Sequence, residues 1–300
     1  MMKDFRVVVV VSPDQSDQYF ANQLMRRLNV VGVIVESQMH ERDNSSTFVK
    51  AFKLLHKPHV FLTKSYNAII DRIRSRHAVY NKPENAADFG EQGLKIIPTE
   101  KKCDILYTAG VNNINAPEYI DWLKNIEPDV IAVCGASIFR EQILAIPGYG
   151  VLNLHGGLSQ KYRGLFTTDW AVHNEEPEYV GATVHYISPG IDDGDVVYQG
   201  RPDDIVADDN PNSLYVKVVK LGVNMMERAI NDIEHGTIRS VPLTEKGDLY
   251  LGKMFTTKIK GATWKKLKHG VIPDYLNNKQ SRDKKVLDSM INDFSNASAH

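Results

Sequence analysis

Short apolar runs alternate with amphipathic stretches along the first half of the chain. Four runs rich in Val, Ile and Leu occupy residues 6–11, 30–35, 129–134 and 151–154. Runs of this length are typical of strands that are buried on both faces of a sheet. Residues 14–28 and 140–146 lie between them and place apolar side chains at helical spacing. The pattern predicts an α/β fold, a Rossmann-like and mostly parallel sheet with helices on both faces.

The second half of the chain predicts the edge of this sheet and a smaller C-terminal region. Residues 180–187, 196–199 and 249–251 are expected to form strands. Residues 213–233 predict one long helix, whose apolar face is formed by Leu214, Val218, Leu221, Met225, Ala229 and Ile233. Residues 276–300 are polar and predict a surface helix followed by a frayed end. We expect a main domain over residues 1–205 and, over residues 206–300, a C-terminal helix with an accessory region and a polar tail.

Residues 39–93 interrupt this alternation. They contain no convincing strand, and residues 51–55 and 68–73 have helical spacing, so a mostly helical insertion between strands is predicted. His40, His56, His59 and His77 fall in this segment at spacings that indicate no metal site. We interpret them as residues of solvated helix faces or as hydrogen-bonded core residues.

Composition and charge narrow the classes of function. The 300 residues carry 36 Lys and Arg against 37 Asp and Glu, a formal charge of −1, so a nucleic-acid partner held by bulk positive charge is not expected. Cys103 and Cys134 cannot form a disulfide framework and fit a reducing compartment. No apolar run approaches the ~20 residues that cross a bilayer, so we expect a cytoplasmic protein without a membrane partner. CxxC and HExxH motifs are absent, and no metal is predicted.

The turn after the first strand carries no nucleotide-binding motif. Ser12-Pro13-Asp14-Gln15-Ser16 stands where a dinucleotide site has GxGxxG, and the Walker A pattern is also absent. The Rossmann-like sheet therefore does not predict NAD or ATP.

Asn153 and His155 stand at the end of the fourth apolar run. Residues two apart on a strand share a face, so both side chains are expected to project together from the carboxyl end of a strand, where α/β sites form. An amide donor beside an imidazole can stabilise an oxyanion and move a proton. The alternative is a polar strand end that caps a turn.

Asp192 lies in a loop punctuated by Gly190 and Gly194. A carboxylate beside an imidazole favours the protonated ring and fixes its orientation. An amide, an imidazole and a carboxylate together suggest acyl transfer without a nucleophilic Ser or Cys. The attacking group would then come from the substrate, and a neutral amine is the natural candidate.

Four spaced motifs resemble the folate-dependent formyltransferases, a family that includes glycinamide ribonucleotide, methionyl-tRNA and sugar N-formyltransferases. In the family's order they are Asn153-Leu154-His155, Lys161-Tyr162-Arg163-Gly164, Thr168-Asp169-Trp170-Ala171 and Gly190-Ile191-Asp192-Asp193-Gly194-Asp195. The resemblance covers residues 100–200 well, the first strands loosely and residues 39–93 not at all. It identifies residues 1–205 as a formyltransferase catalytic domain.

The resemblance implies N10-formyltetrahydrofolate as formyl donor and a primary amine as acceptor. By its motifs, Asn153 and protonated His155 stabilise the oxyanion that forms when the amine attacks the formyl carbon. Asp192 holds His155 charged and, through a water, helps the proton to move from the amine to N10. The family binds the pterin through the backbone of two loops, which map here to Gly135, Ser137, Ile138, Phe139, Gly190 and Ile191. The acceptor side maps to Lys161, Tyr162, Arg163 and Gly164.

Some positions leave alternatives open. Gly157-Leu158-Ser159-Gln160 stands where the family usually has Ser-Leu-Leu-Pro, so the shape of the acceptor side is not fixed by the resemblance. Lys161 and Arg163 either meet a phosphate of the acceptor or solvate a loop. Trp170 and His185 are interpreted as structural residues. The basic run Lys258, Lys260, Lys265, Lys266 and Lys268 forms either a solvated surface or a contact for a nucleotide diphosphate.

The acceptor is expected to be a small molecule. The last hundred residues lack the regularly spaced strands and the strong positive charge that tRNA binding favours. Residues 249–256, followed by Trp264, are similar to what trails the core in sugar N-formyltransferases. A nucleotide-linked amino sugar is therefore the favoured acceptor, and a homodimer is an open alternative to a monomer. The other functions considered are a formyltetrahydrofolate hydrolase, a methionyl-tRNA formyltransferase and a non-catalytic folate- or nucleotide-binding protein.

Overall fold

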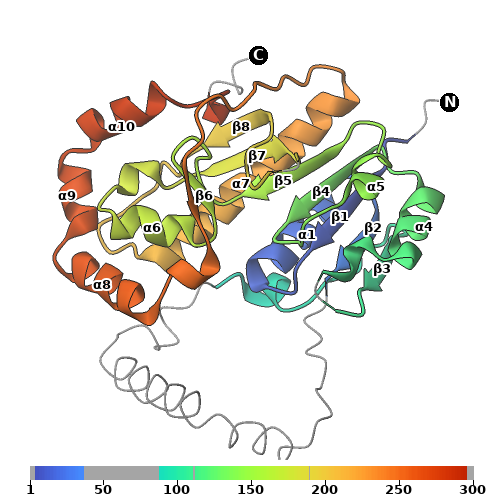
Figure 1. Ribbon diagram of the computed structural model, residues 1–300, viewed down its shortest axis with the longest axis horizontal. Coiled ribbons are helices and arrows are strands. Elements are labelled where there is room, and N and C mark those ends of the chain that lie inside the picture. Colours follow the sequence, from blue (N-terminus) through green and yellow to red (C-terminus); the bar gives the residue numbers. More distant parts are fainter. Residues whose placement is uncertain (1–3, 37–87, 111, 189, 296–300) are drawn as a thin grey trace, which may run out of the picture.

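The computed structural model describes residues 4–36, 88–110, 112–188 and 190–295. Its centre is a seven-stranded sheet in the order β3-β2-β1-β4-β5-β7-β8 (Figure 1). The parallel strands are β1 (Val7–Val11), β2 (Val30–Val35), β3 (Asp104–Tyr107), β4 (Val130–Cys134) and β5 (Val151–His155). β7 (Ala182–Tyr186) is antiparallel to β5, and β8 (Val196–Gly200) is antiparallel to β7. The predicted Rossmann-like, mostly parallel sheet is confirmed.

Successive residues of β1 point into two different helix layers. Val7, Val9 and Val11 pack in one cluster with α1 (Gln15–Arg27) and α7 (Pro211–Glu234). Val8 and Val10 pack in a second cluster with α4 (Pro117–Ile126) and α5 (Glu141–Leu144). Burying one valine contributes roughly 1.5–3 kcal/mol, so a run of valines is most stable where both faces are covered. This explains why β1 is a central strand.

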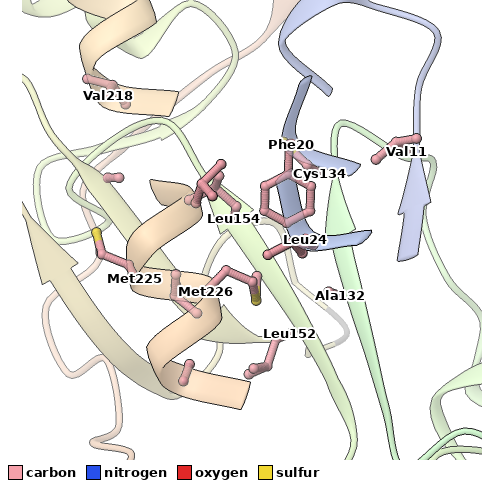
Figure 2. Packing of buried hydrophobic residues seen from close by; sticks show 14 of the residues in the cluster. Val11, Phe20, Leu24, Ala132, Cys134, Leu152, Leu154, Val218, Met225 and Met226 are labelled. Atoms are coloured by element: carbon pink, nitrogen blue, oxygen red, sulfur yellow. The ribbon is translucent and has the colours of Figure 1, made fainter. Parts of the chain in front are cut away.

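Helix α7 completes the first of these layers. It begins at a capping box, in which Asn210 Oδ1 accepts the backbone N–H of Ser213 at 3.3 Å and Ser213 Oγ accepts the backbone N–H of Asn210 at 3.0 Å. Its residue Met226 packs towards Leu152, Phe20 and Leu24, whereas Met225 points to the other side, where its sulfur lies against Gly200 of β8 (Figure 2). The apolar face of α7 is thus covered by the sheet and α1, and the division of the chain near residue 205 stays a prediction.

Several elements were not predicted. They are β3, α4, β6 (Tyr162–Gly164), α6 (Thr167–His173), α8 (Thr257–Lys268), α9 (Val271–Asn277) and the 3-10 helices Gly90–Gly93, Asn113–Asn115, Pro177–Tyr179 and Gly252–Met254. β6 pairs in parallel with β9 (Asp248–Tyr250) in a separate two-stranded sheet. The predicted insertion at 39–93, with its four histidines, lies outside the described residues except for residues 88–93.

The C-terminal region packs against the main domain through α6 and the 3-10 helix Pro177–Tyr179, which contact α8, α9 and α10 (Lys279–Leu287). α10 agrees with the predicted surface helix. The predicted frayed end is wrong for residues 288–295, because Ile291 N donates to Gln199 Oε1 at 2.8 Å and Gln199 N donates to Asn292 O at 3.2 Å. These bonds cover the edge of β8. None of the helices within the described ranges is long and apolar enough to span a membrane.

Candidate functional site

The end of β5 supplies two of the predicted side chains. Leu152 and Leu154 are buried in the cluster beneath α7, so Asn153 and His155 project from the other face of the strand. His155 is only 5% exposed. In the register of the sheet, Leu154 pairs with Cys134 of β4 and Asn153 pairs with His185 of β7.

Asp192 reaches this strand end from the loop after β7. Its Oδ2 lies 3.3 Å from His155 Nδ1, and its Oδ1 accepts Asn153 Nδ2 at 3.4 Å. Asp192 has a φ of 49°, a left-handed conformation that is uncommon outside glycine. The structure therefore brings Asn153, His155 and Asp192 together, and we call these three residues the catalytic trio.

His185, which the sequence analysis interprets as a structural residue, lies in contact with the catalytic trio. It is 3% exposed, and its Nε2 lies 3.1 Å from Asn153 Nδ2 and 3.5 Å from Asp192 Oδ1. Its Nδ1 lies 2.8 Å from Tyr186 O. This contact depends on the antiparallel register of β5 and β7, which pairs Asn153 with His185. The sequence of either strand alone does not show that register.

Several neighbouring groups stabilise the ionised carboxylate of Asp192 and fix the ring of His155. Burial alone would raise the pKa of Asp192, but the neighbouring His155 and His185 and the backbone N–H of Gly164, which donates to Oδ2 at 2.9 Å, hold it well below its usual range. Both ring nitrogens of His155 face oxygen acceptors, since Nε2 lies 2.8 Å from Tyr162 O. A protonated imidazolium satisfies both contacts, whereas a neutral ring has only one N–H to donate.

The loop after β4 carries four of the predicted cofactor contacts. Gly135 adopts a φ of 69°, and a β-carbon there would lie 1.8 Å from Asp17 Oδ2, so only glycine fits. Ser137 N donates to Glu36 Oε2 at 2.5 Å, while Glu36 Oε1 is buried and has no hydrogen-bond partner among the residues that the structure describes. Ile138 is 75% exposed, and Phe139 is buried. This loop follows β4, whose last residue is level with Leu154, so it lies beside the catalytic trio.

The other two predicted cofactor contacts lie on the loop that carries Asp192. Ile191 is 42% exposed, and its carbonyl accepts Arg163 Nη1 at 3.3 Å. Gly190 lies against the carboxylate of Asp193, and Lys246 Nζ donates to Asp193 Oδ2 at 2.8 Å. An exposed apolar side chain on each loop, with backbone groups between them, is a suitable surface for a flat heterocycle.

The predicted acceptor motif, residues 161–164, contacts the catalytic trio through its backbone. Gly164 N binds Asp192, and the carbonyl of Tyr162 binds His155. Arg163 Nε donates to Gly247 O at 2.9 Å, which ties β6 to the C-terminal region. Lys161 Nζ forms an ion pair with Glu176 Oε1 at 2.9 Å. These four residues therefore position the site, and direct contact with an acceptor stays a prediction.

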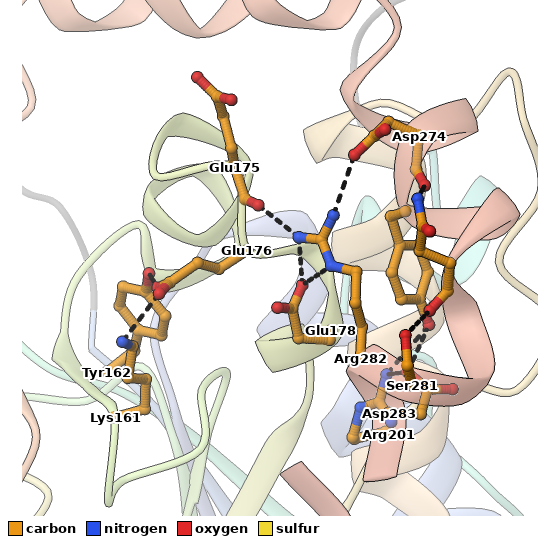
Figure 3. A network of polar contacts seen from close by, with 12 residues as sticks. Lys161, Tyr162, Glu175, Glu176, Glu178, Arg201, Asp274, Ser281, Arg282 and Asp283 are labelled. Carbon is orange, nitrogen blue, oxygen red and sulfur yellow. Dashed lines mark hydrogen bonds and ion pairs between the residues drawn. The ribbon is translucent and has the colours of Figure 1, made fainter. Parts of the chain in front are cut away.

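A polar network continues from this motif to the C-terminal helices (Figure 3). Tyr162 Oη donates to Glu176 Oε2 at 2.5 Å, and burial, together with that carboxylate, raises the pKa of the phenol. Two residues further on, Glu178 Oε2 accepts Arg282 Nη2 of α10 at 2.6 Å. Arg282 Nη2 also donates to Glu175 O at 2.5 Å. Residues 175–178 thus join the site to α10.

Metal binding has no candidate in the part of the chain that the structure describes. Within those ranges, no three His, Cys, Asp or Glu side chains are grouped so that they could hold a metal ion.

The sequence matches a known protein family. A family model described as formyl transferase matches residues 54–230, more than half of the chain. The match begins inside the segment 39–93, so the expectation that this whole segment lies outside the resemblance is wrong for residues 54–93.

Curated relatives match over a shorter stretch. The methionyl-tRNA formyltransferase of Caldanaerobacter subterraneus subsp. tengcongensis is 31% identical over 156 residues, which cover 52% of this chain and 48% of that protein. The methionyl-tRNA formyltransferase of Clostridium tetani is 31% identical over 150 residues, 49% of this chain and 47% of that protein. The chain thus spans about half the length of the curated relatives it matches.

Solved structures share the fold at low sequence identity. A 4-N formyltransferase from Francisella tularensis superposes with a TM-score of 0.50 at 15% identity and covers 87% of both chains. A sugar N-formyltransferase from a Shewanella species has a TM-score of 0.51 at 12% identity and covers 88% of this chain and 87% of that one. A phosphoribosylglycinamide formyltransferase from Anaplasma phagocytophilum has a TM-score of 0.50 at 14% identity, with 83% and 100% covered.

Proposed function

Because the chain belongs to the formyl transferase family, as its motifs indicate, we propose that it transfers a formyl group from N10-formyltetrahydrofolate to a primary amine of a small acceptor, a nucleotide-linked amino sugar. The observation that carries this proposal is the contact of Asn153, His155 and Asp192 at the carboxyl end of β5. These side chains offer an amide donor, a protonated imidazole and a carboxylate at one place, which are the groups that formyl transfer to an amine requires.

Asp192 is the group that fixes the charge of the site. Its carboxylate stays ionised because its pKa is held low. Its Oδ2 lies 3.3 Å from His155 Nδ1, where it can accept the N–H of the ring. His155 is held in orientation by Tyr162 O on its other side. A buried, oriented imidazolium can stabilise negative charge that develops on an oxygen without prior reorganisation.

Asn153 is the second donor. Its amide has two N–H groups, and the contact of Nδ2 with Asp192 Oδ1 at 3.4 Å is long for a hydrogen bond. The N–H that makes this long contact is the one that can turn to the oxygen of the group being transferred when the substrates bind, while the contact with His185 Nε2 at 3.1 Å keeps the amide in place. Asp192 lies next to both donors, and through a water it would help the proton that the attacking amine loses to reach N10 as the bond between N10 and the formyl carbon breaks.

The loops at 135–139 and 190–191 fit the folate co-substrate. Ile138 and Ile191 present exposed apolar surface, and Gly135 between the strand and this loop is itself exposed. The buried Glu36 Oε1, which has no partner among the described residues, adds an acceptor under the same loop. When bound, the folate supplies a formyl group on N10. The residues of the two loops would hold it by its ring system and keep water from the catalytic trio.

The acceptor class rests on the near-neutral charge and on the C-terminal region. A formal charge of −1 disfavours a polyanionic acceptor. β9 and the turn Gly252–Met254 place a compact segment beside Gly164 at the site. Methionyl-tRNA is the second candidate acceptor, favoured by the names of the curated relatives, although the chain spans only about half of their length.

The test is an acceptor panel on the full-length chain. The protein is incubated with N10-formyltetrahydrofolate and, in separate reactions, with nucleotide-linked amino sugars, with methionyl-tRNA and with no acceptor, and the products are read by mass spectrometry. The proposal expects one formyl group on an amino-sugar nucleotide. Formylation of methionyl-tRNA alone supports the second candidate. Release of formate at an equal rate without any acceptor indicates a hydrolase and contradicts the proposal.

A further inference from the structure

Five aromatic rings form a continuous column that leads from the site to the surface. Ring centroids lie 5.6 Å apart for Tyr162 and Tyr250, 4.5 Å for Tyr250 and Trp170, 5.6 Å for Trp170 and Phe255, and 4.9 Å for Phe255 and Phe166. The inner end is buried, since Tyr162 is 1% exposed and its carbonyl holds His155. The outer end is open, since Phe166 is 49% exposed. Such a column is a rigid support for its last ring.

The outer ring is held in an unusual backbone conformation. Phe166 has a φ of 59° and a ψ of 32°, in the left-handed region, where a bulky residue is a rare outlier. Leu165 before it is 58% exposed. Strain of this kind persists where the surrounding structure enforces it, and it is concentrated at functional sites. Here it holds two apolar side chains in water only one and two residues from Gly164, whose N–H binds Asp192.

The C-terminal region completes a surface around Phe166. Leu251 is 38% exposed and Met254 is 42% exposed, and a β-carbon on Gly252 between them would lie 3.4 Å from Leu165 Cδ1. Phe255 stacks on Phe166 with an interplanar angle of 24°. We call Leu165, Phe166, Leu251, Met254 and Phe255 the aromatic platform.

The two segments that form the aromatic platform together carry positive charge, and the nearest carboxylates in the sequence are Asp169, one position after the first segment, and Asp248, one position before the second. Residues 164–168 contain no charged side chain, and the charged residues of 249–258 are Lys253 and Lys258, both exposed. A ligand with a flat ring and a negatively charged linker is therefore complementary to the platform in shape and in charge. A nucleoside diphosphate has this chemistry.

We propose that the aromatic platform binds the base of a nucleoside diphosphate that forms one end of the acceptor, and that Phe166 is the ring on which the base stacks. This inference rests on the proposed function for the identity of the other end, which carries the amine to the catalytic trio. Phe255 supports Phe166 from behind, and Lys253 and Lys258 attract the diphosphate. The platform then selects acceptors by a group that lies away from the reacting amine.

The experiment measures binding of UDP and dTDP to the full-length chain by isothermal titration calorimetry. Base stacking on an aromatic side chain is worth about 1–3 kcal/mol, so Phe166→Ala is expected to raise the Kd by about 5- to 150-fold. Phe166→Trp keeps a stacking ring and is expected to bind as the wild type does. Tyr149→Ala is the matched control, because Tyr149 is an aromatic residue 53% exposed at the opposite end of β5. Circular dichroism of each variant verifies the fold.

The outcomes separate this inference from the proposed function. Equal affinity of wild type and Phe166→Ala overturns the inference, and so does a wild type that binds neither nucleotide. A wild-type dimer that dissociates in Phe166→Ala, without a change in nucleotide affinity, assigns the platform to a second copy of the chain and also overturns it. Formyl transfer to a nucleotide-linked amino sugar at the same kcat/KM in Phe166→Ala as in the wild type overturns the inference but leaves the formyl-transfer function in place. Nucleotide binding that depends on Phe166, without formyl transfer to any acceptor, supports the platform and contradicts the proposed function.

Discussion

His155 Nδ1 lies 3.3 Å from Asp192 Oδ2, and the two side chains are 5% and 13% exposed. The contact joins a strand end to a loop 37 residues later in the chain, and it exists because Gly164 N and Asn153 Nδ2 hold the carboxylate from two other sides. A paired ionisable group at low exposure affects both the chemistry of the site and the stability of the fold.

The pH dependence of stability tests the ionised state of Asp192. Folding lowers the pKa of Asp192, so its carboxylate stabilises the folded protein above about pH 4, the range of an unfolded aspartate, and this contribution is lost as the pH falls further. The difference in free energy of unfolding between wild type and Asp192→Asn should be constant near neutral pH and should shrink in acid. Urea denaturation at a series of pH values measures it. An equal difference at every pH contradicts the account; the exposed Asp208→Asn is the control.

Asp17 should show the opposite dependence. It is 3% exposed, and burial raises its pKa to about 6, although Ser12 and Ser16 donate to it. The neutral acid is therefore favoured in the folded protein, and stability falls as the pH rises from about 4 to about 6. Relative to Asp17→Asn, the wild type should lose on the order of 2–3 kcal/mol of unfolding free energy over this range. The same denaturation series measures this loss, and a wild type that gains stability relative to the variant contradicts it.

Gly135 offers a test of close packing at the cofactor loop. Gly135 and Gly236 have nearly the same φ, 69° and 68°, but a β-carbon at Gly135 would lie 1.8 Å from Asp17 Oδ2, whereas one at Gly236 would meet nothing within 4 Å. Gly236→Ala should cost only the backbone strain, about 1–2 kcal/mol. Gly135→Ala should cost clearly more and should also raise the KM for the folate. Thermal denaturation and steady-state kinetics compare the two variants, and equal losses of stability contradict the packing argument.

Arg282 is expected to hold the C-terminal helices on the main domain. Its guanidinium donates to Glu178 Oε2 at 2.6 and 3.0 Å and to Glu175 O, and it lies 3.3 Å from Asp274 Oδ2 (Figure 3). Hydrogen bonds to charged groups contribute about 1.5–3 kcal/mol each when a partner is removed. Arg282→Ala should therefore speed proteolytic cleavage near α9 and α10.

The exposed Arg239 provides the control for this prediction. Limited proteolysis read by mass spectrometry should show the same cleavage pattern for Arg239→Ala and the wild type. If Arg282→Ala is cleaved no faster than Arg239→Ala, the network does not hold the C-terminal helices in place.

The strands that could be predicted from the sequence are those that are buried at nearly every position. β1, β2, β4 and β5 read directly as apolar runs because helices cover both of their faces. β3 could not be recognised in this way, because it is an edge strand with partly exposed residues at all four positions. β6 has three residues and exists because β9 pairs with it across more than eighty positions of the chain. Periodicity carries no information on such a pairing.

In the candidate site, too, some residues could be predicted from the sequence, whereas others depend on how the strands pair. Asn153 and His155 follow from their place at a strand end, and Asp192 follows from the resemblance of its loop. His185 does not, because its role depends on the register that sets it opposite Asn153. Helix α4 is a different case: Pro117 at its first turn and the buried Tyr119, Ile120 and Leu123 gave a signal that was overlooked.

The most direct test of the central claim is the rate of formyl transfer by Asn153→Ala, measured in a single turnover with N10-formyltetrahydrofolate and the acceptor that the panel identifies. If Asn153 and His155 stabilise the developing oxyanion, the variant should lose about 2–4 kcal/mol of transition-state stabilisation, a fall of about 30- to 1,000-fold in rate, and His155→Ala should fall by a similar factor. Circular dichroism should show the wild-type fold for both variants, and their affinity for UDP should stay close to that of the wild type. A rate for Asn153→Ala within a few-fold of the wild type would contradict the account.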